Sequence, residues 1–156
     1  MTTRNSTADR EIVASRVYDA PRELVWRAWT EQAHVDKWWG PTGFRNATTS
    51  MAVKPGGVWQ FVMHGPDGTD YPNRIRYQEV VKPEKLVFLH DSGKDNDPEE
   101  FHVTVTFEVE GNKTKVTMKT VFKTAAIREM VVKEYGAIEG AKQTLGRLDD
   151  YLKQMK

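Results

Sequence analysis

The sequence contains no cysteine. Disulfide bonds, thiolate nucleophiles and cysteine-ligated zinc sites are therefore excluded, and a reducing compartment such as the cytoplasm is the expected location. An excess of charge of one sign is also missing, because 23 Lys and Arg residues are balanced by 22 Asp and Glu residues. Such a balance gives no broad electrostatic attraction to nucleic acid or to an anionic membrane. No stretch approaches the roughly 20 consecutive apolar residues that a spanning helix needs, so no membrane span is expected.

Motifs of cofactor and nucleophile chemistry are missing as well. The sequence has no phosphate-binding loop, no dinucleotide fingerprint and no G-x-S-x-G nucleophile turn. His64, His90 and His102 fall on or beside predicted strands, and no two of them have the spacing of a zinc-binding pair. We therefore predict no metal, no cofactor and no catalytic residue, and a binding role is favoured over an enzymatic one.

The middle of the chain shows the period of two that is typical of strands. The clearest case is 101–109, where apolar residues alternate with polar ones without a break. Turn sequences rich in Gly, Pro, Asn and Asp separate the other segments. Strands are predicted over 11–18, 44–51, 58–64, 73–81, 86–90, 101–109 and 114–122. Strands that follow one another through short turns form an antiparallel sheet.

Helical spacing appears in two places. After the first strand, Asp19 is predicted to cap a helix with Pro21 in its first turn, and Thr30 to begin a second short helix that ends at Gly40. From Ala125 onward, apolar residues recur every three or four positions without proline, which predicts one helix about 45 Å long. An amphipathic helix of that length has to cover an apolar surface, and the sheet is the available partner.

These elements predict an α+β fold in which a curved antiparallel sheet of about seven strands surrounds a long C-terminal helix. Residues 1–9 are expected to form a flexible tail and residues 10–156 a single domain. Gly136 and Gly140 are expected inside the long helix, where they indicate either close packing on the sheet or space for a ligand. The following residues are predicted to be buried between the sheet and the helix: Phe101, Val103, Val105, Phe107, Ile138, Leu145 and Leu148.

Four segments in a fixed order resemble a known family. They are YDAPRELVWRAWT at 18–30, WWGP at 38–41 followed by Gly43 and Phe44, GGVW at 56–59 with PDG at 66–68, and GAIEG at 136–140 followed by QTL at 143–145 and Leu148. Together they resemble the proteins related to the activator of Hsp90 ATPase, within the START-like superfamily. The resemblance implies a helix-grip fold with a deep cavity between the sheet and the long helix. Superfamily members bind lipids, hormones or polyketides, and others cyclise polyketides or act as co-chaperones.

Three functions are consistent with this resemblance. The leading hypothesis is a protein that binds an apolar or aromatic small molecule in its cavity. The second is a co-chaperone that contacts an Hsp90-type ATPase. The third is an enzyme similar to polyketide aromatases and cyclases, which needs a general acid or base in the cavity. Tyr77, His90 and Glu139 are the candidates for that role.

The predicted ligand site combines aromatic residues and methionines on alternate strand positions with residues of the long helix. Its members are Trp39, Trp59, Phe61, Met63, Tyr77, Phe88, Met130, Tyr135 and Glu139. Of the adjacent pair Trp38 and Trp39, one is expected in the core and one at the cavity, or else both pack the short helix against the sheet. Arg74 and Arg76 are interpreted as a solvated sheet face, with a ligand carboxylate as the alternative partner.

Overall fold

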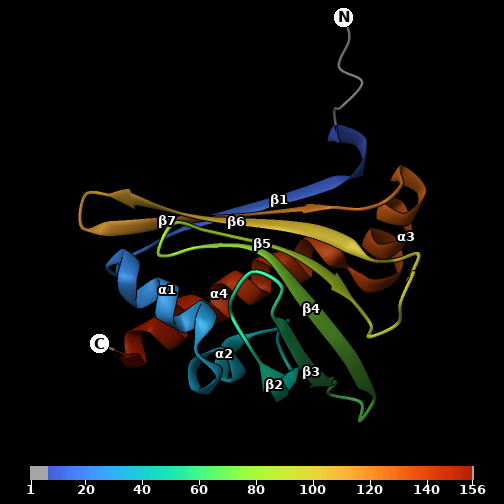
Figure 1. The fold of residues 1–156 in the computed structure, drawn as a ribbon, viewed down its shortest axis with the longest axis horizontal. Coiled ribbons are helices and arrows are strands. Elements are labelled where there is room, and N and C mark those ends of the chain that lie inside the picture. Colours follow the sequence, from blue (N-terminus) through green and yellow to red (C-terminus); the bar gives the residue numbers. More distant parts are fainter. Residues whose placement is uncertain (1–6, 156) are drawn as a thin grey trace, which may run out of the picture.

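A seven-stranded antiparallel sheet forms the body of the molecule (Figure 1). The computed structural model describes residues 7–155. The strands lie in the order β1-β7-β6-β5-β4-β3-β2, so β1 and β2 form the two edges. Their bounds are β1 Glu11–Tyr18, β2 Arg45–Met51, β3 Val58–His64, β4 Asp70–Val81, β5 Lys85–Asp91, β6 Phe101–Glu110 and β7 Lys113–Val121.

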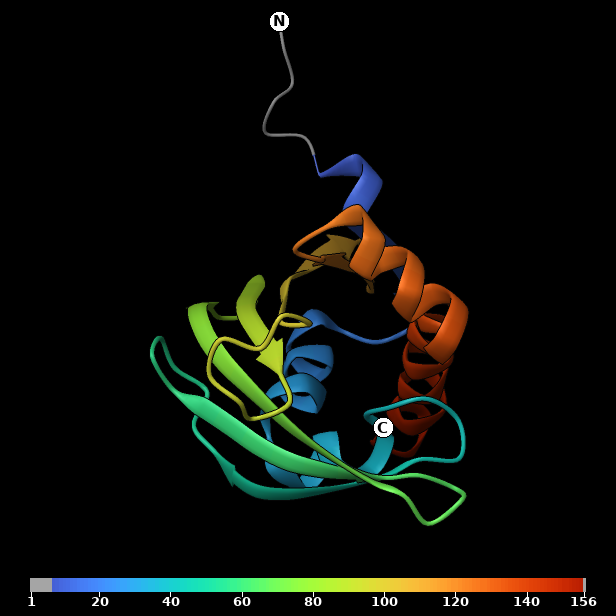
Figure 2. The same ribbon diagram turned by 90° about the vertical axis from the view of Figure 1, so that its right-hand side faces the viewer.

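The helices gather within the curve of this sheet (Figure 2). They are α1 Arg22–Thr30, α2 Gln32–Trp38, α3 Ala125–Tyr135 and α4 Ala137–Met155, preceded by a short 3-10 helix at Ala8–Arg10. The predicted α+β, helix-grip architecture is confirmed. Of the predicted tail, residues 1–6 lie outside the described residues, and Ala8 already belongs to the 3-10 helix. None of the described helices is long and apolar enough to cross a membrane.

The short helices begin later than the sequence suggests. Pro21, not Asp19, occupies the N-cap position of α1, because its extended backbone directly precedes Arg22. Thr30 does not start α2 but ends α1, where its hydroxyl donates to the carbonyl of Trp26 at 2.8 Å. Threonine and aspartate suit both caps and helix ends, so the residue type alone did not fix these boundaries.

The C-terminal helix is broken, and the prediction of one continuous helix from Ala125 is wrong. Gly136 ends α3 in the left-handed conformation, with φ of 61°, and its N–H donates to the carbonyl of Val131. This backbone shape favours glycine because other L-residues meet a steric penalty there. Helix α4 therefore has 19 residues, equivalent to about 28 Å.

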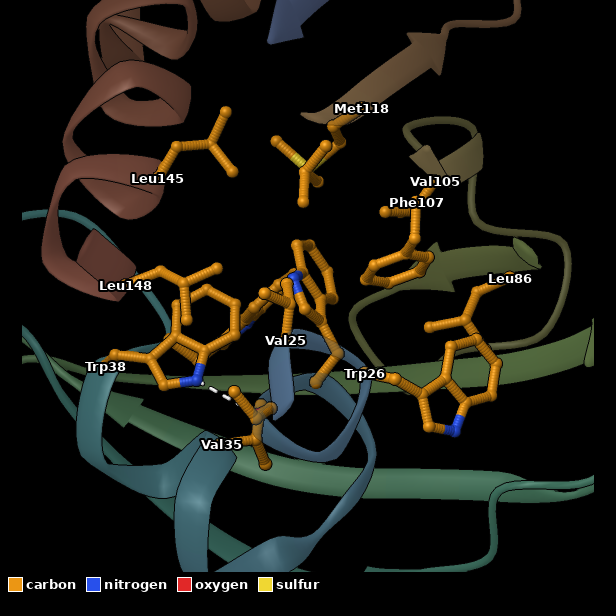
Figure 3. Close-up of a cluster of buried hydrophobic side chains, with 14 of the residues drawn as sticks. Val25, Trp26, Val35, Trp38, Leu86, Val105, Phe107, Met118, Leu145 and Leu148 are labelled. Atoms are coloured by element: carbon orange, nitrogen blue, oxygen red, sulfur yellow. Dashed lines mark hydrogen bonds between the residues drawn. The ribbon is translucent and has the colours of Figure 1, made fainter. Parts of the chain in front are cut away.

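Two hydrophobic clusters fill the interior. In the larger, Leu145 and Leu148 of α4 point toward Met118 and Val105 of the sheet, and α1 and α2 pack alongside (Figure 3). The smaller cluster joins Ile12, Phe122 and Val131 beneath α3. All of the predicted sheet–helix core residues are buried or half-buried except Ile138, which is 36% exposed. That single prediction is wrong because α4 restarts after Gly136 and turns Ile138 toward solvent.

Candidate functional site

A cavity of about 370 Å³ lies between the two hydrophobic clusters. Its wall draws on the concave sheet face, the segment after α2, the loop between β5 and β6, and the facing sides of α3 and α4. We call the following residues the cavity wall: Ile12, Trp39, Gly40, Pro41, Met63, Asn73, Phe88, His90, Asp91, Ser92, Asp97, Glu99, Phe101, Val103, Met118, Thr120, Phe122, Val131, Tyr135, Ala137, Ala141 and Thr144.

Strand register explains why these side chains converge. Phe88 pairs with Val103, and His90 pairs with Phe101 on the neighbouring strand. Residues directly opposite each other in an antiparallel sheet project from the same face. Met118 and Thr120 of β7 continue this row because they pair with Val105 and Val103. The concave face thus presents one connected set of side chains to the cavity.

Four of the nine residues predicted to bind ligand belong to the cavity wall, namely Trp39, Met63, Phe88 and Tyr135. The other five lie elsewhere. Trp59, Phe61 and Tyr77 are buried in the larger cluster, outside the cavity wall. Met130 is half-buried against the smaller cluster, and Glu139 is exposed. Strand alternation puts Trp59, Phe61 and Tyr77 on the concave face, but the cavity does not extend to their part of that face.

Trp39 directly follows α2, and contacts of the neighbouring residues fix its place in the cavity wall. Its neighbour Trp38 is fully buried, and the indole N–H of Trp38 donates to the carbonyl of Ala28 at 3.0 Å. From α4, the Arg147 guanidinium donates to the carbonyls of Gly40 and Pro41 at 2.9 and 3.0 Å. Gly40 has φ of 105°, and a Cβ there would approach Met63 Cε to 3.1 Å. The close approach and the backbone shape together require glycine next to Trp39.

A buried polar pair interrupts the apolar wall. His90 Nε2 lies 2.7 Å from Asn73 Oδ1, and His90 is only 9% exposed. The amide orientation is fixed by a second bond, since Asn73 Nδ2 donates to the carbonyl of Tyr71 at 2.8 Å. Asn73 Oδ1 must then accept, so the proton of the neutral imidazole resides on Nε2. The other nitrogen of His90, Nδ1, consequently carries a lone pair.

Burial among aromatic rings keeps this imidazole neutral. Its ring centroid lies 4.6 Å from that of Phe101 and 5.9 Å from that of Phe61. Burial lowers the pKa of His90 to about 4, although the nearby charge of Asp91 opposes the shift. At neutral pH the side chain is therefore an uncharged hydrogen-bonding group inside an aromatic environment.

An ion-pair network anchors the loop that borders the cavity. The carboxylate of Asp91 is fully buried and receives Nε and Nη2 of Arg74, each at 3.0 Å, and Nη2 of Arg76 at 3.2 Å. Burial acts to raise the pKa of Asp91, but hydrogen bonds from Arg74 and the Gly93 N–H outweigh it and hold the pKa below its usual range. Arg76 also pairs with Glu100. Both arginines thus have carboxylate partners within the protein, so the interpretation of a simple solvated face is wrong.

The loop itself is internally bonded. Asp97 accepts hydrogen bonds from the Ser92 hydroxyl at 2.7 Å and from the Glu99 N–H at 2.9 Å. Lys123 Nζ, just beyond β7, donates to the Asp97 carbonyl at 2.8 Å. The loop and α3 lie at the same end of the sheet (Figure 1), and Ser92, Asp97 and Glu99 contribute to the cavity wall. This end of the cavity is therefore bordered by carboxylates.

Little in this arrangement resembles a catalytic constellation. Of the three acid–base candidates, Tyr77 is buried outside the cavity wall and Glu139 is exposed, whereas His90 belongs to the wall. Burial raises the pKa of Tyr77 well above its usual range, so its hydroxyl stays protonated. Within residues 7–155, no three His, Asp or Glu side chains gather closely enough to hold a metal ion.

Sequence reasoning missed several wall residues, above all His90 and Asn73 as a pair. From the sequence, His90 is a candidate only for a catalytic or metal-binding role. The available signal was its separation from Phe88 by two positions in a strand, which places both on one face. The partnership with Asn73 depends on the pairing of β4 with β5, where Ile75 lies opposite His90, and on a side chain reaching across.

A curved antiparallel sheet around a long C-terminal helix, with a cavity between them, defines the helix-grip class of the START-like superfamily. Residues 19–153 match the family described as Activator of Hsp90 ATPase homolog 1-like protein, and the chain belongs to that family. No curated protein matches the sequence.

Solved bacterial structures share the fold. Protein NE0264 from Nitrosomonas europaea has 24% identity and a TM-score of 0.84, with 96% of this chain and 97% of that chain covered. Protein Ms6760 from Mycobacterium smegmatis has 22% identity and a TM-score of 0.86, with 97% and 96% covered. The AHSA1 (SPO3351) protein from Silicibacter pomeroyi has 20% identity and a TM-score of 0.76, with 94% and 99% covered. At these identities the similarity defines the fold alone.

Proposed function

We propose that this protein binds an apolar or aromatic small molecule in the cavity between its two hydrophobic clusters. The main observation in support of this proposal is the cavity of about 370 Å³, which falls within the usual size range of small-molecule sites. Most of its wall is aliphatic or aromatic, with Trp39, Phe88 and Phe101 among the larger surfaces. The cytoplasmic location expected from the absence of cysteine stays a prediction.

The same observation favours a binding protein over the two alternatives. A co-chaperone acting only through its surface has no need of an interior space of this size. A cyclase needs an acid or base whose pKa lies near the working pH. Of the three candidates Tyr77, His90 and Glu139, His90 alone belongs to the wall, and a pKa of about 4 makes it a weak base. Both alternatives are therefore less well supported than ligand binding.

A cavity-filling variant gives the sharpest test. Ala141 of α4 belongs to the cavity wall and is half-buried, so Ala141→Phe places a ring in the space where the ligand would lie. Ala126 of α3 is exposed and outside the wall, so Ala126→Phe adds the same ring without filling the cavity. The probe is N-phenyl-1-naphthylamine, a neutral dye whose fluorescence rises in apolar surroundings.

We expect saturable binding of one dye per chain to the parent and to Ala126→Phe. Ala141→Phe should weaken binding at least about tenfold, equivalent to about 1.4 kcal/mol. Thermal melts of the free proteins check that the variants fold, because overpacking costs about 1–3 kcal/mol. Equal dye affinity in all three proteins, or no saturable binding to the parent, would show that the cavity is not a ligand site.

A further inference from the structure

His90 lies in the cavity wall, and one of its two ring nitrogens has no hydrogen-bond partner within residues 7–155. Its Nε2–H is used by Asn73 Oδ1, and no hydrogen bond within residues 7–155 involves its Nδ1. Nor is Nδ1 sealed off by packing, since the described buried polar atoms without a partner are Trp29 Nε1, Asn46 Oδ1 and Arg76 Nε. His90 is a cavity wall residue, so a molecule in the cavity would lie beside its imidazole ring.

The charges around the cavity further restrict the chemical class of the ligand. Among the described residues, the cavity wall contains no Lys or Arg. It does contain Asp91, whose carboxylate is occupied by Arg74 and Arg76, and also Asp97 and Glu99 at the loop. An anionic ligand would leave water without meeting a cation and would approach two further carboxylates. Burial of an unpaired charge is strongly unfavourable, so carboxylates and phosphates are disfavoured.

We propose that the ligand is a neutral apolar molecule carrying one hydrogen-bond donor, a hydroxyl or an N–H, which donates to Nδ1 of His90. The proposal rests on the proposed binding function and specifies the chemistry of that ligand. Asn73 acts as a positioning residue, because its bond to Nε2 keeps the lone pair on Nδ1. The apolar and aromatic wall residues, Phe101 and Phe88 among them, then surround the rest of the molecule.

Three probes of matched shape test this proposal. They are p-cresol, its methyl isostere p-xylene, and the anion p-toluate, each titrated by calorimetry. Because a hydroxyl also costs desolvation, the decisive quantity is how each affinity changes between the parent and His90→Phe. Thr120→Val is the matched control, since Thr120 is a wall residue whose hydroxyl could accept the ligand's hydrogen bond in place of His90.

We expect His90→Phe to weaken p-cresol binding about three- to tenfold relative to p-xylene, the range of one neutral hydrogen bond. Thr120→Val should affect both ligands equally, and p-toluate should bind more weakly than either. Loss of the p-cresol preference in Thr120→Val instead of His90→Phe would overturn the proposal, as would preferred binding of p-toluate. If p-xylene and p-cresol respond alike to His90→Phe, the inference fails while the proposed function stands. If neither p-cresol nor p-xylene binds saturably to the parent, the inference and the proposed function are both refuted.

Nuclear magnetic resonance of the parent protein decides the question even if His90→Phe does not fold. Long-range correlation of the imidazole should show a proton on Nε2 and none on Nδ1 of His90. Addition of p-cresol should move the Nδ1 resonance, whereas p-xylene should leave it nearly unchanged. A proton on Nδ1 in the free protein, or equal shifts with both probes, would contradict the assignment of Nδ1 as acceptor.

Discussion

Lowering the pH from 7 to 5 should destabilise the fold through one residue, His90. The unfolded chain binds a proton at His90 below its ordinary pKa of 6.5, whereas the folded protein does so only near pH 4. Between these values the unfolded state holds more protons, so stability falls as the pH falls. Above pH 6.5 both states are neutral, and below pH 4 the loss is complete.

The magnitude follows from the two pKa values. At pH 5 the unfolded His90 is almost fully protonated and the folded one almost fully neutral, which costs about 2 kcal/mol relative to pH 7. The limiting cost below pH 4 is about 3 kcal/mol. Carboxylates such as Asp91 and Asp97 have pKa values below their ordinary 3.8, so their contributions are lost only at lower pH. The interval from pH 7 to 5 therefore separates His90 from them.

Urea denaturation at pH 7, 6 and 5, followed by tryptophan fluorescence, measures this effect. The comparison is with His90→Phe, in which His34, His64 and His102 are retained and their contributions cancel. The parent should lose about 2 kcal/mol more than the variant across this range. Equal losses in the two proteins would refute the conclusion that His90 is buried in its neutral form, and with it the environment described for the cavity.

Three further predictions concern the framework around the cavity. Leu145→Ala should destabilise the fold by about 2–5 kcal/mol in urea denaturation, because Leu145 is only 2% exposed in the larger cluster. A loss of stability near zero would mean that α4 does not pack against the sheet. Asp91→Asn should destabilise the fold by about 1–3 kcal/mol, since it removes the charge of a fully buried carboxylate that accepts hydrogen bonds from Arg74 and Arg76, while these arginines keep Asp95 and Glu100 as partners. The exposed Asp95→Asn should change stability by less than about 1 kcal/mol. Gly136→Ala should destabilise the fold by about 1–2 kcal/mol because Gly136 has a positive φ. Gly140→Ala should stabilise it by up to about 1 kcal/mol, since the added Cβ would come no nearer than 4.0 Å to another residue. Thermal melts that reverse this order would contradict the assigned helix break.

Strands were predictable because their signal is local. Alternation on 101–109 and turn residues at the strand ends reproduced nearly every strand, and the bounds of β1 and β3 agree with the structure. The helix break at Gly136 was missed for a physical reason. Apolar residues continue at helical spacing on both sides of it, so the periodicity alone does not reveal the break. A glycine preceded by Lys133 in the last turn was the available signal for a C-terminus.

The candidate site was harder to predict than the fold. Trp59, Phe61 and Phe88 are all buried, but of these three only Phe88 belongs to the cavity wall. The ring of Trp39, which directly follows α2, lies 5.5 Å from that of Trp59 and 6.4 Å from that of Phe61. Which part of a concave face is covered depends on helix placement, which strand alternation does not encode. His90 and Asn73 meet across paired strands, so their contact depends on register rather than on spacing along the chain.

The position of the cavity between two unequal clusters has a consequence for local unfolding. Helix α4 buries Thr144, Leu145, Leu148 and Leu152, whereas Val131 is the one described buried residue of α3. Segments with few buried contacts open at lower free energy than the whole protein unfolds. Amide hydrogen exchange should therefore be faster in α3 than in α4, with α3 opening while the sheet and α4 stay folded. A ligand bound at the proposed site would contact both α3 and α4. If the opening of α3 admits that ligand, its binding should slow amide exchange in α3 more than in α4.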